Sequence, residues 1–427
     1  MAKTLLFLAP AMAGPGRRAR GKSLFPPLNL ALLAAMTPPD WDMKIIDEAV
    51  DTLPQDATAD LVAITSITAV APRAYQLGDD FRKRGAKVVM GGMHPSAVPE
   101  EAALHSDAVV IGEAEPVWPE VLADFQKGTL KRFYKAPFLP DLQGLPRPRR
   151  DLFNPKGYLT VNTVQTSRGC PHDCEFCAVT RFFGRRYRVR PVDDVLEELD
   201  QIRSKMVLFV DDNIAGNPPH AKRLFKALSG LGLSWIGQSS LNIAKDPDLL
   251  RLASRSGCRG LFIGFESLIS ENLERIGKGL VNRVDEFKES IQRIHDHGIG
   301  IEGAFIFGFD RDDVGVIRRT VEFAKAVRLE AAQFGILTPF PGTPLYERME
   351  REGRILERDW SKYTISKVVF EPAGMTRQSL SDAFAWAYKE FYSYRSILAR
   401  LLPGLRRNFK FFFPINLGFR RIVSQLR

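Results

Sequence analysis

The sequence predicts an α/β protein with three parts: a doubly wound parallel sheet, then an incomplete barrel of six strand–helix units, then a small, mostly helical region. Short apolar runs alternate with helix-like segments over residues 1 to about 125, and again from 160 to about 337. This alternation is typical of parallel sheets covered by helices. A proline-rich stretch separates the two alternations, and the pattern ends near residue 350. We therefore expect domains at 1–127 and 159–350, a linker at 128–158 and a helical region at 351–427.

The composition is that of an ordinary globular protein, with 45% hydrophobic and 26% charged residues in a chain of 427. No apolar run approaches the roughly 18 residues that a membrane-spanning helix needs. Four cysteines are too few for a disulfide framework and favour a reducing compartment. We therefore expect a cytoplasmic protein.

In the first domain, apolar runs of four to six residues predict buried strands with helices between them. The loops after these strands read SITAVAPRAY, GGMHPS and GEAEP, and in an open parallel sheet such loops form the ligand crevice. Gly91, Gly92 and Gly112 let a large ligand approach the backbone, and His94 lies beside them. Many flavodoxin-like domains have similar loops. The expected strands are Thr4–Ala9, Lys44–Asp47, Leu61–Thr65, Lys87–Gly91 and Ala108–Ile111, and the expected helices are Leu28–Met36, Ala71–Arg84 and Pro116–Lys127.

The second alternation predicts six βα units in series. Such an array favours a barrel or partial barrel with its site at the carboxyl ends of the strands. The expected strands are Thr160–Thr166, Met206–Asp211, Ser234–Ser239, Gly260–Gly264, Gly300–Phe307 and Ala332–Leu337. The expected helices are Pro191–Arg203, Pro218–Leu231, Pro247–Ser256, Val284–His297 and Asp313–Arg328.

Three cysteines, Cys170, Cys174 and Cys177, form a C-x3-C-x2-C pattern directly after the first strand of this array. Thiolates are soft ligands that suit zinc or iron–sulfur centres. A structural zinc site closes all four positions, and its fourth ligand here would have to be His172, Cys258 or a remote residue. Three thiolates on a four-iron cluster instead leave one iron open to a substrate or cofactor.

The residues around the cysteines predict a tight, positively charged loop. Gly169 permits and Pro171 favours the sharp turns of a tight loop. Arg168 adds a positive charge that we expect to balance an anionic cluster.

The cysteine spacing, with Phe176 before the third cysteine, resembles the signature of the radical S-adenosylmethionine (SAM) enzymes. The resemblance implies that the cysteines hold a 4Fe–4S cluster, that the open iron binds SAM, and that an electron cleaves SAM to a 5′-deoxyadenosyl radical. It favours the cluster over zinc and implies an external reductant such as a flavodoxin or ferredoxin.

Other segments extend the resemblance to the subgroup with an N-terminal cobalamin-binding domain. LFVDDN, GCRGLFIGFES, GAFIFGFD and PFPGTPLYE are similar to barrel segments of this subgroup, and PPLNLALLAAM, VVMGGMHPS and IGEAE are similar to its first domain. The resemblance covers nearly the whole chain. It implies a cobalamin-binding type of sheet domain and a radical SAM type of partial barrel.

The resemblance also implies cofactor-binding residues at the ends of three barrel strands. The second strand would face the SAM amino group, the fourth its ribose or methionine part, and the fifth its adenine. The alternative for the acidic residues is a helix N-cap or a polar barrel mouth. The candidates in strand order are Asp211, Asp212 and Asn213, then Glu266, then Gly303 and Gly308.

Cobalamin is implied without a nameable cobalt ligand. Many cobalamin domains place a histidine below the cobalt through an Asp-x-His-x-x-Gly motif, which this sequence does not contain. We expect His94 near the corrin or its nucleotide tail rather than on the cobalt. The subgroup often lacks the motif, so cobalamin stays an expected cofactor.

The C-terminal segment from Arg395 to Arg427 carries eight arginines and lysines, no acidic residue and many aromatics. This composition favours contact with an anionic membrane surface or an amphiphilic substrate. The alternative is a helix pair packed on the barrel with a basic outer face. Nucleic acid is not expected, because no recognition motif accompanies the charge.

The favoured function is cobalamin-dependent C-methylation of an unactivated carbon in a lipid or other amphiphile. The segments EPAGMTRQSL and EFYSYRSILARLL resemble the C-terminal region of members that act on hopanoid and other isoprenoid lipids. The alternatives are radical cyclisation, carbon–carbon bond formation or rearrangement in a tetrapyrrole, lipid or secondary-metabolite pathway, and a non-catalytic cobalamin or iron–sulfur sensor. Methylthiolation of tRNA is disfavoured, because no further cluster cysteines precede Cys170.

Overall fold

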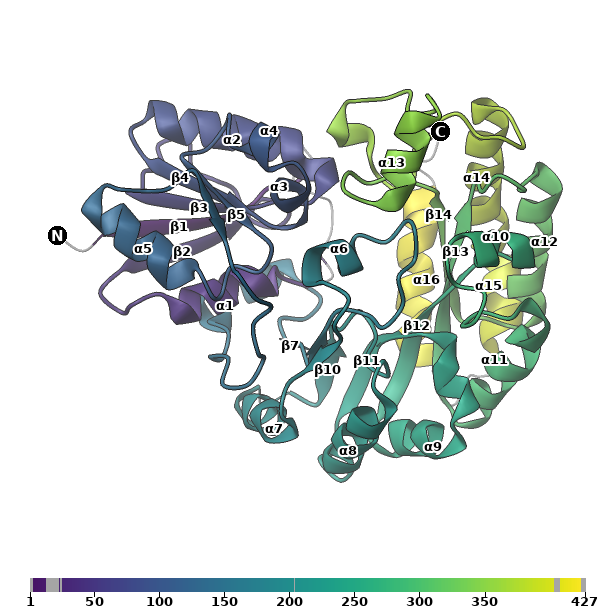
Figure 1. Cartoon of the computed structure of the whole chain (residues 1–427). Coiled ribbons are helices and arrows are strands. Elements are labelled where there is room, and N and C mark those ends of the chain that lie inside the picture. Colours follow the sequence, from purple (N-terminus) through teal and green to yellow (C-terminus); the bar gives the residue numbers. More distant parts are fainter. Residues whose placement is uncertain (1–2, 13–22, 24, 203, 403–407, 424–427) are drawn as a thin grey trace.

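The computed structural model describes residues 3–12, 23, 25–202, 204–402 and 408–423. Two six-stranded parallel sheets form the body of the molecule and lie beside each other (Figure 1). The first sheet has the strand order β2-β1-β3-β4-β5-β6, which extends the doubly wound flavodoxin-like order by one strand. Its strands are β1 (Thr4–Ala9), β2 (Asp42–Asp47), β3 (Leu61–Thr65), β4 (Lys87–Gly91), β5 (Ala108–Ile111) and β6 (Phe133–Lys135).

Helices cover both faces of the first sheet because its strands are apolar on both faces. Phe7 points into the core under α1 (Leu28–Met36) and α5 (Trp118–Lys127), where its ring lies 5.8 Å from that of Trp118. The next residue, Leu8, points to the opposite core, with Phe81 of α2 (Ala71–Lys83). The short helices α3 (Met93–Ala97) and α4 (Pro99–Ala102) follow β4. The doubly wound architecture predicted for this part is confirmed.

The predicted linker contributes more structure than expected. Strand β6 lies within it and pairs in parallel with β5. The Tyr158 hydroxyl, near its other end, donates a hydrogen bond of 3.0 Å to Asp47 of the first sheet. A three-residue strand among prolines is too short for periodicity to reveal.

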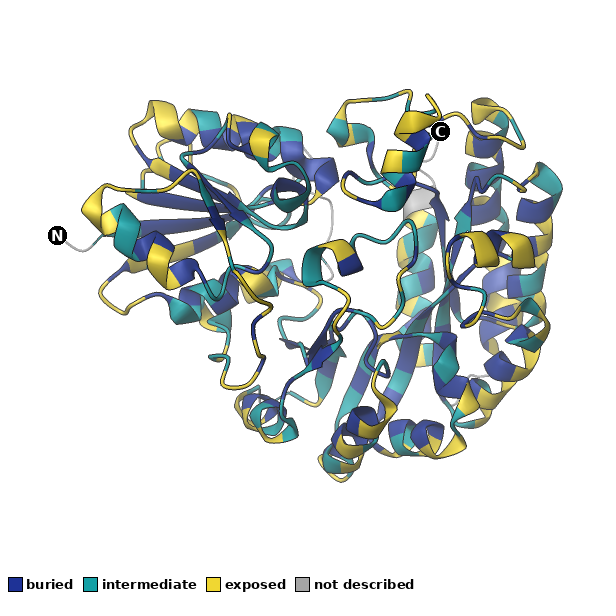
Figure 2. Ribbon diagram, viewed as in Figure 1, coloured by how far each residue is buried: buried dark blue, intermediate teal, exposed yellow. Residues whose placement is uncertain are grey.

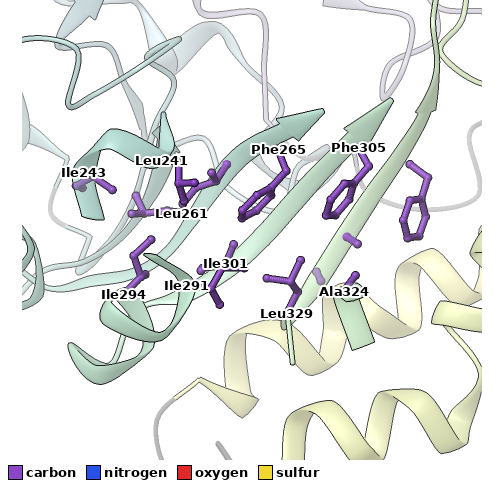
Figure 3. Close-up of a cluster of buried hydrophobic side chains, with 14 of the residues drawn as sticks. Leu241, Ile243, Leu261, Phe265, Ile291, Ile294, Ile301, Phe305, Ala324 and Leu329 are labelled. Atoms are coloured by element: carbon purple, nitrogen blue, oxygen red, sulfur yellow. The ribbon is translucent and has the colours of Figure 1, made fainter. Parts of the chain in front are cut away.

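The second sheet has the order β14-β13-β12-β11-β10-β7, and every pairing in it is parallel. Helices cover its outer side, so that buried strands lie beneath helices with exposed outer faces (Figure 2). Figure 3 shows this core, where Phe265 and Phe305 point from β12 and β13 toward the helices. The strands are β7 (Thr163–Val164), β10 (Met206–Phe209), β11 (Ser234–Ser239), β12 (Cys258–Glu266), β13 (Gly300–Phe307) and β14 (Ala331–Ile336). The helices are α7 (Val192–Gln201), α8 (Pro218–Leu228), α9 (Pro247–Arg255), α10 (Ser270–Arg275), α11 (Phe287–Asp296) and α12 (Val314–Ala326).

The first barrel strand is shorter than predicted. After β7 the chain forms β8 (Ser167–Arg168), which pairs antiparallel with β9 (Arg188–Val189). This ribbon closes the base of the segment that carries the cysteines. Arg203, the expected last residue of the following helix, lies outside the described residues.

The C-terminal helices protect the open edge of the barrel sheet. The Tyr388 hydroxyl of α14 (Arg377–Phe391) forms hydrogen bonds with the backbone of Phe334 in the edge strand β14. The hydroxyl of Tyr392, the C-cap residue of this helix, forms the same bonds with the backbone of Ala332. These bonds satisfy backbone groups that a seventh strand would otherwise pair. Two further helices follow, α15 (Tyr394–Leu401) and α16 (Phe409–Val423), and α13 (Pro344–Arg351) precedes α14.

The aromatic residues of the C-terminal region pack on the barrel. Phe412 is 2% exposed, and a β-carbon added at Gly300 would lie 2.4 Å from its ring. Phe409, Phe411, Phe413 and Phe419 pack partly buried against the barrel core. The packed helix pair therefore describes this region, and membrane contact is not supported. Residues 403–407 and 424–427 of the basic tail lie outside the described residues, and within the described ranges no helix is long and apolar enough to cross a membrane.

Candidate active site

The three cysteines lie in a loop, residues 169–187, whose base is the β8–β9 ribbon. Cys174 is buried, and Cys170 and Cys177 are half-buried. Burial raises the pKa of Cys174 to about 11 and that of Cys177 to about 12, and the neighbouring thiols add to both shifts. Thiols in this environment become thiolates when a cationic centre binds them.

The cysteine loop is fixed to two other elements by Glu175. Its backbone N–H donates to the carbonyl of Ile276 at 3.1 Å, and its carbonyl accepts from the N–H of Leu345 at 3.1 Å. Its carboxylate receives a hydrogen bond of 2.6 Å from Arg348. The loop is therefore held against α10 and α13 from both sides.

A single metal ion needs several ligands that point at one position. Among the described residues, no group of three or more His, Cys, Asp and Glu side chains is placed to hold one ion. Thiolates on a four-iron cluster bind separate irons, so they need not converge on one point. The three neighbouring thiols fit such a cluster.

Asp211 anchors the ribbon. One of its carboxylate oxygens, Oδ1, accepts hydrogen bonds from the Thr166 N–H at 2.9 Å, the Thr166 hydroxyl at 3.0 Å and the Ser167 hydroxyl at 2.6 Å. The other oxygen, Oδ2, is buried without a hydrogen-bond partner in the part of the chain that the structure describes. Burial raises the pKa of Asp211 to about 6. The predicted contact of Asp211 with SAM stays a prediction.

The next two residues contact the cysteine loop directly. The Asp212 carboxylate accepts from the N–H of Gly169 at 3.2 Å, and the Asn213 amide nitrogen lies 4.0 Å from the Cys170 sulfur. Asn213 also accepts from the N–H of Ser240 at 3.2 Å. The structure thus brings the end of the second barrel strand to the cysteines.

Glu266 lies at the end of β12 in a left-handed conformation, with φ at +66°. Its carboxylate forms a buried ion pair with Lys278. Lys278 follows α10 and was not singled out by the sequence, because a single lysine twelve positions after Glu266 belongs to no motif.

Gly303 and Gly308 lie close to side chains of neighbouring elements. A β-carbon at Gly303 would lie 2.6 Å from Leu329, and one at Gly308 would lie 2.9 Å from Leu380. Gly308 also has a φ of +100°, which favours glycine. The predicted approach of this strand to adenine stays a prediction.

A cavity of about 530 Å³ lies between the first domain and the barrel. Its walls are mostly apolar and come from the ends of the first-domain strands, from α1 and from the segment around the cysteine loop. The residues that line the cavity include Gly91, Gly92, Gly112, Glu113, Glu115, Trp118, Gln165, Arg168, Phe182 and Phe183.

The two glycine loops differ in what surrounds the glycine. Gly92 has a φ of +99°, and a β-carbon there would lie 2.8 Å from the Ser66 carbonyl oxygen, so the protein's own backbone requires this glycine. A β-carbon at Gly112 would meet no atom within 4 Å. A broad cofactor can therefore approach the ends of β4 and β5 closely.

His94 lies behind the cavity wall and does not line it. Its Nε2 is 2.9 Å from the Tyr75 hydroxyl, and its Nδ1 is 3.3 Å from the Thr68 hydroxyl. Burial lowers the pKa of His94 to about 4. The ring of Trp360, from the C-terminal region, packs against it with centroids 5.3 Å apart.

Arg168 joins the two domains. Its guanidinium contacts Glu113 and Glu115 at 2.5 Å each, and Arg188 also pairs with Glu113 at 2.5 Å. Arg168, Arg188 and Glu113 are buried at the domain boundary, and Glu115 is partly buried there. The expectation that Arg168 balances a cluster is therefore replaced by a bridge to the first domain, because two carboxylates already offset its charge.

Comparisons with known proteins fit this geometry. The model of the radical SAM superfamily matches residues 164–324, the B12 binding domain matches 16–122, and a domain of unknown function (DUF4070) matches 343–408. The chain is 35% identical to bacteriochlorophyllide d C-12(1)-methyltransferase of Chlorobaculum tepidum, over 94% of this chain and 90% of that protein. The chain belongs to the cobalamin-dependent radical SAM methyltransferases.

Other members of this methyltransferase family are more distant. Bacteriochlorophyllide d C-8(2)-methyltransferase of Chlorobaculum tepidum is 29% identical over 89% of the chain and 88% of that protein. The hopanoid C-2 methylase of Rhodopseudomonas palustris is 28% identical over 79% of the chain and 66% of that protein.

Solved structures share the fold of this methyltransferase. TsrM of Kitasatospora setae, with cobalamin and a [4Fe–4S] cluster bound, superposes with a TM-score of 0.64 at 16% identity, over 82% of this chain and 75% of that one. The cobalamin-dependent enzyme OxsB gives 0.65 at 15% identity, over 91% and 67%. The family uses a 4Fe–4S cluster, SAM and cobalamin, and its radical chemistry requires a reductant.

Proposed function

We propose that this enzyme transfers a methyl group to an unactivated carbon of a large, rigid amphiphile, and that a chlorophyllide-type tetrapyrrole is the first candidate. Two relatives that align over most of their length are named for methylation of bacteriochlorophyllide d. A third is named for methylation of a hopanoid, which shares the rigid polycyclic shape.

The observation that carries the proposal is the cavity at the domain boundary. Gly91, Gly92 and Gly112 line it on the first-domain side, and Gln165 and Phe182 line it on the side of the cysteine loop. The cavity thus lies between the expected cobalamin loops and the flank of the cysteine loop at Phe182 and Phe183. The cluster and SAM supply a 5′-deoxyadenosyl radical, and cobalamin supplies the methyl group.

In this proposal the protein's own residues bind and orient the cofactors. Cys170, Cys174 and Cys177 hold the cluster, and Asp212 and Asn213 line the adjoining SAM site. Glu266 binds the ribose or methionine part of SAM, and Asp211 holds the ribbon beneath the loop. The glycines of the strand-end loops hold cobalamin, while His94 supports that wall from behind.

The domain boundaries at 127, 158 and 350 stay predictions.

The experiment uses the full chain, reconstituted anaerobically with iron, sulfide and cobalamin. It receives a chemical reductant, SAM with a deuterated methyl group, and either a bacteriochlorophyllide or a hopanoid. Mass spectrometry should find the intact labelled methyl group on the tetrapyrrole. Label on the hopanoid alone would replace the tetrapyrrole as the substrate class.

The second candidate is radical cyclisation. The anaerobic magnesium-protoporphyrin IX monomethyl ester cyclase of Cereibacter sphaeroides is 24% identical over 86% of this chain and 69% of that protein, which favours this alternative only weakly. Cyclisation would give an unlabelled product that has lost hydrogen, and the same mass spectrum would reveal it.

A further inference from the structure

Lys278 lies at the barrel mouth beside the cysteine loop. The residue is 8% exposed. Its ammonium donates to the Gly264 carbonyl at 3.1 Å and pairs with the Glu266 carboxylate. A lysine this deeply buried is rare without a partner, and its carboxylate partner here, Glu266, is an expected SAM-binding residue.

The backbone before Lys278 is docked on the cysteine loop. Ile276 accepts a hydrogen bond of 3.1 Å from the N–H of Glu175, which lies between two of the cysteines. Gly277 has a φ of +76°, and a β-carbon there would lie 3.2 Å from the Asp173 carbonyl oxygen. The cysteine loop and Lys278 therefore keep a fixed distance from each other.

The backbone of Glu266 is strained in a way that directs its carboxylate to Lys278. A non-glycine residue in the left-handed region is sterically strained. Asn282 bonds the carbonyls of Gly264 and Phe265 at 2.8 and 2.9 Å, which holds the strand end in this conformation. Strain that is held by surrounding contacts is a feature of functional sites.

Lys278 is a buried cation next to the cysteine loop, since the two residues before it contact that loop at Glu175 and Asp173. Arg168, the cation that the sequence placed in this role, is instead paired with Glu113 and Glu115. Lys278 is thus a second buried cation, and it directly follows the segment that packs against the cysteine loop.

We propose that Lys278 is a positioning residue that keeps a positive charge beside the cluster and holds the Glu266 carboxylate at the barrel mouth. The proposal rests on the cluster assignment within the proposed function. Three thiolates make a 4Fe–4S centre anionic, and reduction adds a further electron. A nearby fixed cation stabilises the reduced form, so it makes the reduction potential less negative.

The test is an EPR-monitored redox titration of the full chain with its cluster reconstituted, without methyl acceptor. Iron and sulfide analysis confirms that each variant is loaded. Lys278→Met removes the charge and keeps the length of the side chain. We expect its reduction equilibrium to fall by about tenfold, which corresponds to about 59 mV for one electron.

Two further variants and a control separate charge from structure. Lys278→Arg should restore a potential close to that of the natural protein. Glu266→Gln keeps the shape of its side chain and removes one negative charge, so it should shift the potential in the opposite direction. Lys245→Met, which removes an exposed lysine paired with Glu286, should leave the potential unchanged.

Loaded Lys278→Met protein with an unshifted potential would overturn the proposal. If that variant holds no cluster, Glu266→Gln decides, and an unchanged potential there would overturn it equally. The titration needs no substrate. Failure of this proposal is therefore distinguishable from failure to methylate a tetrapyrrole.

Discussion

Glu113→Gln should loosen the contact between the two domains. The Glu113 side chain is 3% exposed and accepts hydrogen bonds from Arg168 at 2.5 Å and from Arg188 at 2.5 and 3.1 Å. Glutamine keeps the shape, but it leaves Arg168 with Glu115 as its carboxylate and Arg188 without a carboxylate partner among the described residues. Breaking a buried ion pair from one side costs about 3–5 kcal/mol. Arg188 keeps its bond to the Pro140 carbonyl, so we expect about 3 kcal/mol.

The assay is urea-induced unfolding of the full chain, followed by tryptophan fluorescence, with the midpoint of the first transition as the readout. Glu120→Gln is the matched control. Its pair with Lys131 is about half exposed and screened by solvent, so its loss should leave the midpoint nearly unchanged. Equal midpoints for the two variants would refute the idea that the buried network joins the domains.

Three other predictions concern stability. Burial lowers the pKa of His94 from 6.5 to about 4, so only the unfolded state takes up a proton between these pH values. The contribution of His94 to the unfolding free energy should therefore fall by about 3 kcal/mol as the pH drops from 7 to 4. Urea unfolding at several pH values measures this change, and His94→Gln should lack it. Trp360→Phe removes the 2.8 Å hydrogen bond from the indole N–H to Glu101, so the unfolding free energy should fall by about 1 kcal/mol. Amide hydrogen exchange at residues 68–70 should become faster, and unchanged exchange would contradict this prediction. Tyr392→Phe leaves the buried N–H and carbonyl of Ala332 unpaired, so it should lower the unfolding free energy by about 2 kcal/mol, and a neutral effect would show that the edge of β14 is protected otherwise.

The sequence could predict what repeats or has a fixed spacing. Apolar runs located β1, β3 and β5 at their observed bounds, because a strand buried on both faces is apolar throughout. The cysteine pattern predicted the cluster loop for a comparable reason, since ligand spacing is local in sequence.

Contacts between distant segments could not be predicted in this way. Arg168 and Glu113 are far apart in the sequence, so no local pattern predicts their ion pair. Without this partner in view, the charge of Arg168 was expected to act on the cysteines nearby in the sequence. Lys278 reaches Glu266 only because α10 returns to the barrel mouth. The aromatic C-terminal segment looked exposed because its packing surface, the barrel at Gly260 and Gly300, is far away in the chain.

The measurement that tests the central claim most directly is the yield of two products from SAM. Reconstituted, reduced protein with cobalamin and a methyl acceptor should form 5′-deoxyadenosine and S-adenosylhomocysteine together, because one SAM gives the radical and another gives the methyl group. Cys174→Ala should form no 5′-deoxyadenosine. Full SAM cleavage by Cys174→Ala, or methylation without 5′-deoxyadenosine, would contradict the account.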